Sequence, residues 1–234
     1  MINRLGFPGR GAAFVARQLQ GPRPAGLVLG VNLGKNKDTP LEQAASDYLS
    51  LAQAFAPLAD YLAINVSSPN TVGLRRLQAR DNLQALLASL AEQRGVDAQR
   101  LGRRVPLLIK LAPDLTDDEL DDALQAVLDT GMDGVIATNT TVGRDGVHSP
   151  LAAESGGLSG APLREMSTAI VKKISARTQG ARQQGSLPVI GVGGVGSARD
   201  VQEKLDAGAC LVQVYTALIY EGPGLVKKIL REMG

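Results

Sequence analysis

One lysine of the sequence lies inside an apolar stretch. Lys110 is flanked by Leu108, Ile109 and Leu111. A buried ammonium group is costly unless an anionic partner meets it. One interpretation is a cation that faces an anionic atom of a ligand. The alternative is a core lysine that forms an ion pair or whose charged end reaches water.

A second polar concentration is the segment 65–70, which reads NVSSPN and holds two amides and two hydroxyls. Pro69 fixes its own backbone and holds Ser68 extended. Further amide and hydroxyl groups come from Asn3, Asn139 and Thr140. Amides both donate and accept hydrogen bonds, which suits a ligand such as a pyrimidine ring. A turn capped by its own side chains is the alternative.

The segment 191–196 reads GVGGVG and matches the G-x-G-x-x-G pattern of dinucleotide-binding folds. The next apolar stretch, however, ends in Tyr215 and Thr216 and not in an acidic residue. In (β/α)8 barrels, the loops after strands seven and eight often bind phosphate, and here these loops would be Gly193-Gly194 and Tyr215-Thr216. A glycine-rich turn without a ligand remains a third interpretation.

These residues follow short apolar runs that alternate with segments of helical period. Strands are predicted at 27–33, 61–66, 106–111, 134–138, 188–192 and 211–215. Their apolar character on both faces predicts a parallel sheet covered by helices. Polar residues occur at or near the carboxyl ends of nearly all of these strands, which is where parallel α/β folds bind ligands.

The helices between the strands carry start and stop signals. Capping boxes are predicted at Thr39 to Glu42, with Pro40 at the first helical position, and at Thr116 to Glu119, with a stop at Gly131. Further helices are predicted at 82–93 (ending at Gly95), 163–178 and 197–208, and a polar loop at 143–157. Because no linker interrupts the alternation, residues 1–234 are predicted to form a single α/β domain.

Composition excludes several classes of function. The 25 basic and 23 acidic residues balance to a net charge of +2, so no nucleic-acid partner is expected. The single cysteine and single histidine exclude a disulfide framework and Cys-rich or His-rich metal sites, so no metal is expected. Uncharged runs are shorter than the ~20 apolar residues of a membrane span, and no signal peptide is evident. The chain alone is therefore expected to be soluble and cytoplasmic.

Eight motifs taken together resemble class 2 dihydroorotate dehydrogenase. They are NRLGF at 3–7, GVNLGKNK at 30–37, NVSSPN at 65–70, IKLAPD at 109–114, ATNTT at 137–141, GGLSG at 156–160, GVGG at 191–194 and VQVYT at 212–216. The resemblance runs in order from Met1 to the C-terminus. It implies an FMN-binding (β/α)8 TIM barrel that oxidises dihydroorotate to orotate in pyrimidine (UMP) biosynthesis and passes the electrons to a quinone.

The resemblance also implies residue roles. Ser68 matches the catalytic base, and a serine at this position supports class 2 because class 1 relatives use cysteine. The residues that match substrate-binding positions are Asn3, Arg4, Leu5, Gly6, Phe7, Asn65, Asn70, Asn139 and Thr140. The residues that match FMN contacts are Asn32, Asn65, Lys110, Thr138, Gly160, Gly194, Tyr215 and Thr216. Lys110 would face the pyrimidine edge of the flavin, where negative charge develops on reduction.

The predicted fold is a (β/α)8 barrel that lacks its first two strands and its N-terminal helical segment, because six strands are predicted where a barrel has eight. In the complete family protein, that segment would carry the quinone tunnel and a peripheral contact with the inner membrane. Three other interpretations remain: another FMN- or phosphate-binding barrel enzyme, an inactive barrel fragment, and a Rossmann-type NAD enzyme.

Overall fold

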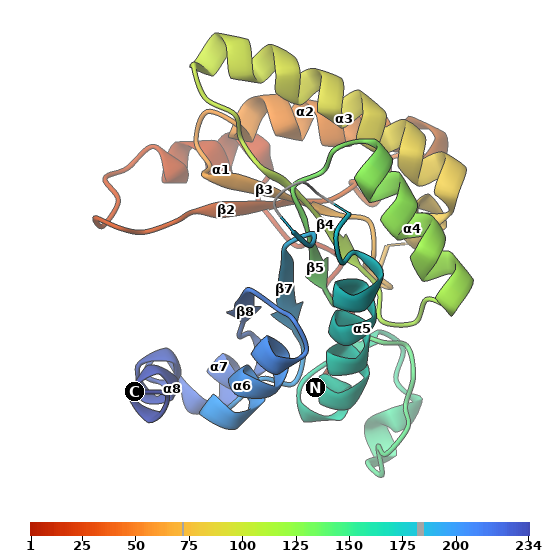
Figure 1. The fold of residues 1–234 in the computed structure, drawn as a ribbon, viewed down its shortest axis with the longest axis vertical. Helices are drawn as coiled ribbons and strands as arrows, with labels where there is room; N and C mark the ends of the chain where they lie inside the picture. The colour runs from red at the N-terminus through yellow and green to blue at the C-terminus, as the bar shows by residue number, and fades with distance from the viewer. Residues whose placement is uncertain (72, 182–184) are drawn as a thin grey trace.

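The computed structural model describes residues 1–71, 73–181 and 185–234, and within them six parallel strands form one curled sheet (Figure 1). The strands are β2 (Gly30–Leu33), β3 (Tyr61–Asn65), β4 (Leu107–Leu111), β5 (Gly134–Ala137), β7 (Val189–Val192) and β8 (Leu211–Gln213). Their order in the sheet is β2-β3-β4-β5-β7-β8. All six lie within the stretches that the sequence predicts, and the parallel sheet is confirmed.

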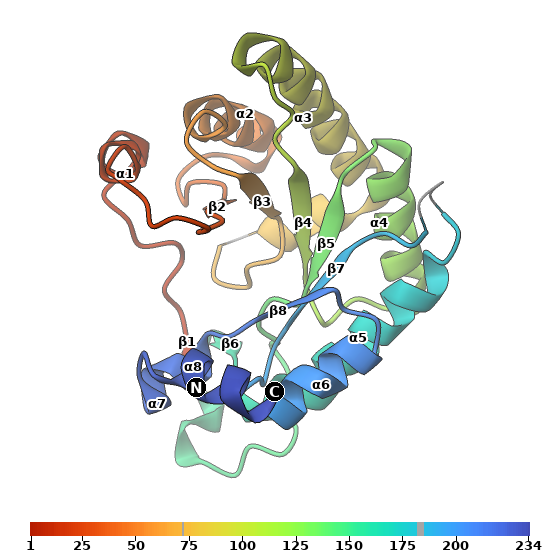
Figure 2. The same cartoon turned by 60° about the vertical axis from the view of Figure 1, so that its left-hand side comes forward.

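Helices cover the outer side of this sheet (Figure 2). The helices are α1 (Ala12–Leu19), α2 (Ala44–Phe55), α3 (Arg80–Leu101), α4 (Asp117–Asp129), α5 (Arg164–Arg177), α6 (Ala198–Asp206), α7 (Thr216–Glu221) and α8 (Leu225–Glu232). Short 3-10 turns occupy Leu41–Gln43, Leu74–Gln78, Pro150–Ala153 and Ala161–Leu163. In the described part of the chain, none of these helices combines the length and the apolar character that crossing a bilayer requires.

The two faces of the sheet differ in what they bury. Side chains alternate between the faces of a strand. Outward residues such as Ile64, Ile109 and Val135 join the helices in the main hydrophobic core. Inward residues form a small separate cluster of Ala63, Leu108, Ile136 and Ile190. The stability of the fold therefore rests on the outer face, and the inner face is free to carry polar groups.

The sequence prediction was wrong about the extent of one helix. Helix α3 runs through Gly95 to Leu101 and ends at Gly102, whose φ of 68° is left-handed. A glycine inside a helix costs about 0.5–1 kcal/mol relative to alanine. Contacts beyond Gly95 offset that cost. The buried Asp97 accepts hydrogen bonds from Gln93 at 3.1 Å and from Arg100 at 2.7 Å, and Leu101 packs against the main hydrophobic core.

Of the two predicted capping boxes, the one at Thr116 is confirmed and the one at Thr39 is wrong. Thr116 accepts a hydrogen bond from the backbone N of Glu119 at 3.2 Å, and the Glu119 carboxylate accepts from the backbone N of Thr116 at 2.8 Å. At Thr39 the chain forms a 3-10 turn with Pro40 as its uncapped N-terminal residue. The Thr39 carbonyl oxygen instead accepts a hydrogen bond from the Lys35 ammonium at 2.5 Å, which ties this segment to a different local structure.

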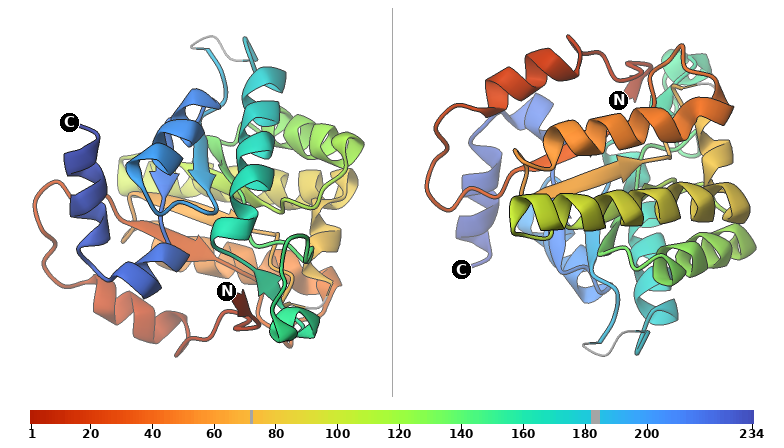
Figure 3. Two further views of the ribbon diagram at one scale, coloured as in Figure 1. Left: turned by 90° about the horizontal axis from the view of Figure 1, so that it is seen from below. Right: turned by 90° about the horizontal axis from the view of Figure 1, so that it is seen from above.

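Several elements have no counterpart in the sequence prediction: α1, α7, α8 and an antiparallel pair of short strands. Strand β1 (Ile2–Asn3) pairs with β6 (Gly157–Leu158), 154 to 156 residues further along the chain. The predicted loop 143–157 thus contains the turn Pro150–Ala153 and ends in a strand. Figure 3 shows the N-terminus beside this loop. The pairing brings the N-terminal segment to the carboxyl ends of the main strands.

Replacing Thr116 by alanine should lower the free energy of unfolding by about 1 kcal/mol, the usual value for a lost N-cap. Thr39→Ala is the matched control, because the Thr39 side chain caps no helix and should cost less than about 0.5 kcal/mol. Urea denaturation of the two variants measures the difference. Equal losses would show that the capping box at Thr116 contributes nothing.

Candidate functional site

A cavity of about 740 Å³ opens at the carboxyl ends of the strands. Its walls include the ends of β3, β4, β7 and β8 and the residues that follow β5. The N-terminal segment and α7 line it as well. The sequence places a ligand site at these strand ends, and the structure has its cavity there.

The cavity collects most of the predicted site residues. Those in its lining are Asn3, Leu5, Gly6, Phe7, Asn65, Ser68, Asn70, Lys110, Thr138, Asn139, Thr140, Gly160, Gly194, Tyr215 and Thr216. Arg4 and Asn32 are outside it. Arg4 is exposed and forms an ion pair with Glu154 at 2.6 Å, while Asn32 is exposed on the edge strand β2.

Amides and hydroxyls from two strand ends are bonded to one another. Asn139 Nδ2 donates to Asn65 Oδ1 and to Ser67 Oγ, both at 3.1 Å. Asn139 Oδ1 accepts from the backbone N of Thr140 at 2.8 Å. From the outer side, the Tyr48 hydroxyl donates to the carbonyl of Asn65 at 2.8 Å. These bonds hold the loops after β3 and β5 in place in the structure as it stands.

Asn70 has a buried acceptor that is left unsatisfied. Its Nδ2 donates to Asn3 Oδ1 at 3.2 Å, which ties the N-terminal segment to the loop after β3. Its Oδ1 is buried and has no hydrogen-bond partner within residues 1–71, 73–181 and 185–234. A buried acceptor without a donor costs about 1–3 kcal/mol. A ligand that donates a hydrogen bond here would remove that cost.

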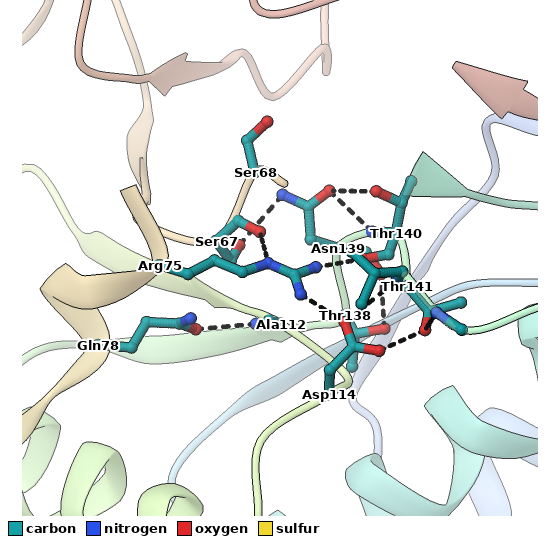
Figure 4. A network of polar contacts seen from close by, with 12 residues as sticks. Ser67, Ser68, Arg75, Gln78, Ala112, Asp114, Thr138, Asn139, Thr140 and Thr141 are labelled. Carbon is teal, nitrogen blue, oxygen red and sulfur yellow. Dashed lines mark hydrogen bonds and ion pairs between the residues drawn. The ribbon is translucent and has the colours of Figure 1, made fainter. Parts of the chain in front are cut away.

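Ser68 is 7% exposed and lines the same cavity. Its Oγ accepts a hydrogen bond from the backbone N of Asn70 at 3.2 Å. Figure 4 shows its side chain pointing away from Asn139 and Thr140. Among the described residues, no imidazole or carboxylate hydrogen-bonds to this hydroxyl, so the Ser68 environment differs from that of a Ser-His-Asp triad.

Lys110 lies on the inner face, next to Asn65 and Ile136 in the register of the sheet. Burial lowers the pKa of its ammonium group below the usual value for lysine. In the part of the chain that the structure describes, no carboxylate pairs with it and no acceptor takes a hydrogen bond from it. The interpretation as an ion-paired core lysine therefore has no support, and an anionic ligand atom in the cavity would meet an uncompensated charge.

The turn after β7 is closely packed against the start of α5. Gly193 and Gly194 have φ values of 126° and 70°, which favour glycine. A Cβ atom at Gly194 would lie 2.4 Å from the Arg164 Cβ, so the backbone has no room for a side chain. Asp200 fixes the following residues by accepting hydrogen bonds from the Gly196 backbone N at 3.0 Å and the Ser197 hydroxyl at 2.8 Å. Glycine turns of this kind can present N–H groups to a phosphate.

The buried Lys204 supports this turn and has no counterpart in the sequence prediction. The Lys204 ammonium donates to Ser167 Oγ at 2.5 Å, to Thr168 Oγ1 at 2.6 Å and to the Arg164 carbonyl at 3.1 Å. Ser167 Oγ in turn lies 3.1 Å from the Gly193 carbonyl oxygen. The sequence contains a weak indication that Lys204 is buried, because helical spacing puts Lys204 on the same face of α6 as the buried Val201.

A curled parallel sheet with outer helices and a ligand cavity at its strand ends defines the class of (β/α)-barrel-type proteins. The family model described as "Dihydroorotate dehydrogenase" matches residues 1–234, and the chain belongs to that family. The resemblance noted in the sequence is thereby confirmed.

Relatives and solved structures agree with this assignment. A protein of Arthrobacter sp. (strain FB24), named "Dihydroorotate dehydrogenase (quinone)", is 50% identical over 245 aligned residues, which cover 100% of this chain and 66% of the relative. A protein of the same name from Alkalilimnicola ehrlichii is also 50% identical, with 99% of this chain and 66% of the relative covered. The chain thus spans about two thirds of the length of these relatives.

The fold is similar to that of solved structures as well. One similar structure is the crystal structure of DHODH in complex with ferulenol from Eimeria tenella, with a TM-score of 0.89 and 38% sequence identity. The match covers 99% of this chain and 66% of the Eimeria chain. The ligand-free form from the same organism gives the same TM-score and identity, with 68% of that chain covered. The prediction of a barrel-type fold is confirmed.

The lowered pKa of Lys204 should be visible in the pH dependence of the free energy of unfolding. Burial lowers the pKa of the Lys204 ammonium group to about 8. The negative charges of Glu203 and Asp200 oppose this decrease, and the positive charge of Arg164 adds to it. The unfolded chain keeps this proton up to pH about 10.5 and the folded chain loses it near 8. Between these values the unfolded state binds more protons, so the free energy of unfolding rises with pH. Lys204→Met should remove this part of the rise.

Urea denaturation at pH 8 and pH 10 measures the effect, as the difference in unfolding free energy between the parent and Lys204→Met. That difference should grow with pH in favour of the parent. Lys172→Met, at an exposed position on α5, is the control and should keep the parent's slope. The same slope in Lys204→Met would contradict the depressed pKa.

Proposed function

We propose that the protein containing this chain oxidises dihydroorotate to orotate with FMN as electron acceptor and a quinone as final acceptor, in pyrimidine (UMP) biosynthesis. The observation that carries the proposal is one cavity that holds a half-buried cation, Lys110, with no partner among the described residues, beside a cluster of amides and a buried hydroxyl, Ser68. The quinone is inferred from the printed names of the relatives.

The residues present fit FMN. The closely packed Gly193-Gly194 turn and the residues Tyr215 and Thr216 at the start of α7 would hold its phosphate. Lys110 would meet the pyrimidine edge of the flavin, with Asn65, Thr138 and Gly160 as further contacts. When bound, FMN would supply a two-electron acceptor for the hydride that leaves the dihydroorotate ring. Lys110 would stabilise the negative charge that accompanies this transfer.

The amide cluster would orient the substrate ring. Asn3, Asn65, Asn70 and Asn139 offer both donors and acceptors, and the unsatisfied Oδ1 of Asn70 favours a ring N–H. With the ring held in this way, Ser68 Oγ would take the C5 proton. Because no imidazole or carboxylate hydrogen-bonds to Ser68 within the described residues, its own proton would pass to a water or to another hydroxyl.

The central experiment is the absorbance spectrum of the purified protein, followed by addition of dihydroorotate without oxygen. We expect a yellow protein whose flavin absorbance bleaches with dihydroorotate and returns with a quinone. A protein that takes up FMN and has no affinity for orotate would be a different flavin enzyme. A colourless protein that takes up no FMN would contradict the proposal and favour an inactive fragment.

Lys110→Ala should slow reduction of the flavin by dihydroorotate by about 100-fold or more, because one preorganised charge at a developing anion contributes a few kcal/mol. In flavin-free protein, the same change should not lower the thermal midpoint, since a partly desolvated ammonium group without a partner is destabilising. Stopped-flow absorbance and a thermal melt measure the two effects, with the exposed Lys37→Ala as control. Unchanged reduction together with a lower midpoint would make Lys110 a structural residue.

Ser68→Ala should keep FMN and orotate binding and slow flavin reduction at least ~100-fold, the usual scale for loss of a positioned base. Reoxidation by quinone should be unchanged, because Ser68 acts only on the substrate proton. Stopped-flow absorbance separates the two half-reactions, and Ser89→Ala is the control, at a half-exposed position on α3 whose hydroxyl donates to the carbonyl of Ala85. If the variant is reduced as fast as the parent, another group accepts the proton.

A further inference from the structure

Arg75 contacts two strand-end loops from outside the cavity. It lies in the 3-10 turn Leu74–Gln78, which follows β3. Its Nε donates to the Ser67 carbonyl at 3.2 Å and its Nη2 donates to the Thr140 carbonyl at 2.9 Å (Figure 4). One guanidinium group therefore joins the loop after β3 to the loop after β5.

Asp114 connects a third loop to this group. Its carboxylate forms an ion pair with Arg75 Nη1 at 2.7 Å and comes from the loop after β4. It also accepts hydrogen bonds from the Thr141 hydroxyl and, at 3.4 Å, from the backbone N of Val142. From the same turn as Arg75, Gln78 Oε1 accepts a hydrogen bond from the backbone N of Ala112 at 3.0 Å. The loops after three neighbouring strands are thus fixed to one turn of the chain.

The two carbonyls that Arg75 binds are next to the proposed catalytic and binding groups. Ser67 directly precedes Ser68, and Thr140 directly follows Asn139. A guanidinium is planar and holds its donors in a rigid fork, so it fixes the positions of its acceptors relative to one another. The side chains of Arg75 and Asp114 are only 25% and 21% exposed, which limits screening of their attraction by water.

We infer that Arg75 is a positioning residue: paired with Asp114, it sets the distance between Ser68 and the Asn139-Thr140 segment. This inference rests on the proposed function, in which Ser68 takes a proton from a ring that Asn139 and Thr140 help to hold. Arg75 itself does not line the cavity. Because misplacement of reacting groups by about 1 Å can cost ~100-fold in rate, a small shift between these two loops should be visible in the kinetics.

The main test is Arg75→Lys in the flavin-loaded protein. Lysine keeps the positive charge beside Asp114 but cannot bind both carbonyls and the carboxylate in one plane. We expect flavin reduction by dihydroorotate to slow by about 10- to 100-fold. The KM for dihydroorotate and the affinity for orotate should change less than kcat, and reoxidation by quinone should be unchanged.

Arg103→Lys is the matched control. Arg103 also donates to backbone carbonyls, those of Ala56 and Ala59 at 3.0 Å, before the amino end of β3 and hence away from the cavity. A purely structural role for Arg75 predicts that the two variants lose similar thermal stability and have similar reduction rates. A positioning role predicts that Arg75→Lys alone is slow.

A second readout needs neither flavin nor substrate. Hydrogen exchange of the backbone amides should accelerate in both 66–71 and 139–142 in Arg75→Lys and stay unchanged there in Arg103→Lys. Asp114→Asn is a milder change, because it leaves both hydrogen bonds from Arg75 to the backbone carbonyls, and it should accelerate exchange less in the same segments. It replaces Arg75→Lys as the test variant if Arg75→Lys does not fold.

The outcomes separate the two proposals. Failure of the proposed function appears in the parent, as a flavin that dihydroorotate does not reduce. The positioning role is overturned if an active parent and Arg75→Lys are reduced equally fast. With an inactive parent, unchanged exchange in 66–71 and 139–142 overturns it.

Discussion

An ammonium group without a partner among the described residues, that of Lys110, lies on the inner face of the sheet, and it constrains where the fold can bury its apolar groups. A parallel sheet is stable when apolar groups cover both faces. Here Ile109 and Leu111, the neighbours of Lys110 on β4, point outward into the main core with the helices. That core supplies most of the buried apolar area, and the inner cluster of Ala63, Leu108, Ile136 and Ile190 is small. Because the helices stabilise the fold from outside, the inside tolerates a charge.

The sequence predicted the strands well because their signal is local and strong: short runs, apolar on both faces, between turn residues. Helix ends were less predictable. At Thr116 the capping partners are only three residues apart, so the sequence itself contains the whole contact. At Thr39 the Lys35 ammonium binds the backbone carbonyl, and beyond Gly95 the buried Asp97 and the core-packed Leu101 continue helix α3. Neither the side-chain spacing of a capping box nor the presence of one glycine contains these contacts.

The cavity was predictable for a geometric reason: parallel strands bring their carboxyl ends to one edge, so Asn65, Lys110 and Thr138 must lie near one another. The supporting residues were not predictable in this way. Arg75 binds a carbonyl 65 residues away, and Lys204 binds one 40 residues away. Since backbone carbonyls occur at every residue, no spacing in the sequence identifies such acceptors. The resemblance placed Arg4 and Asn32 at the site too, and the structure leaves both outside the cavity.

Three cations near the cavity, Arg75, Lys110 and Lys204, differ in how their charge is compensated, and of the three only Lys110 has no oxygen partner among the described residues. Arg75 has Asp114 as its partner. Lys204 has three oxygen acceptors, and the nearby Asp200 and Glu203 favour its charged form. For Lys110, desolvation is the cause of the pKa shift, and it lowers the pKa of the ammonium group. A cation that is held in place before the ligand arrives needs no reorganisation when negative charge develops beside it. The bonds that fix the loops after β3, β4 and β5 keep the groups around Lys110 in place as well, so the site is preorganised by contacts outside the cavity.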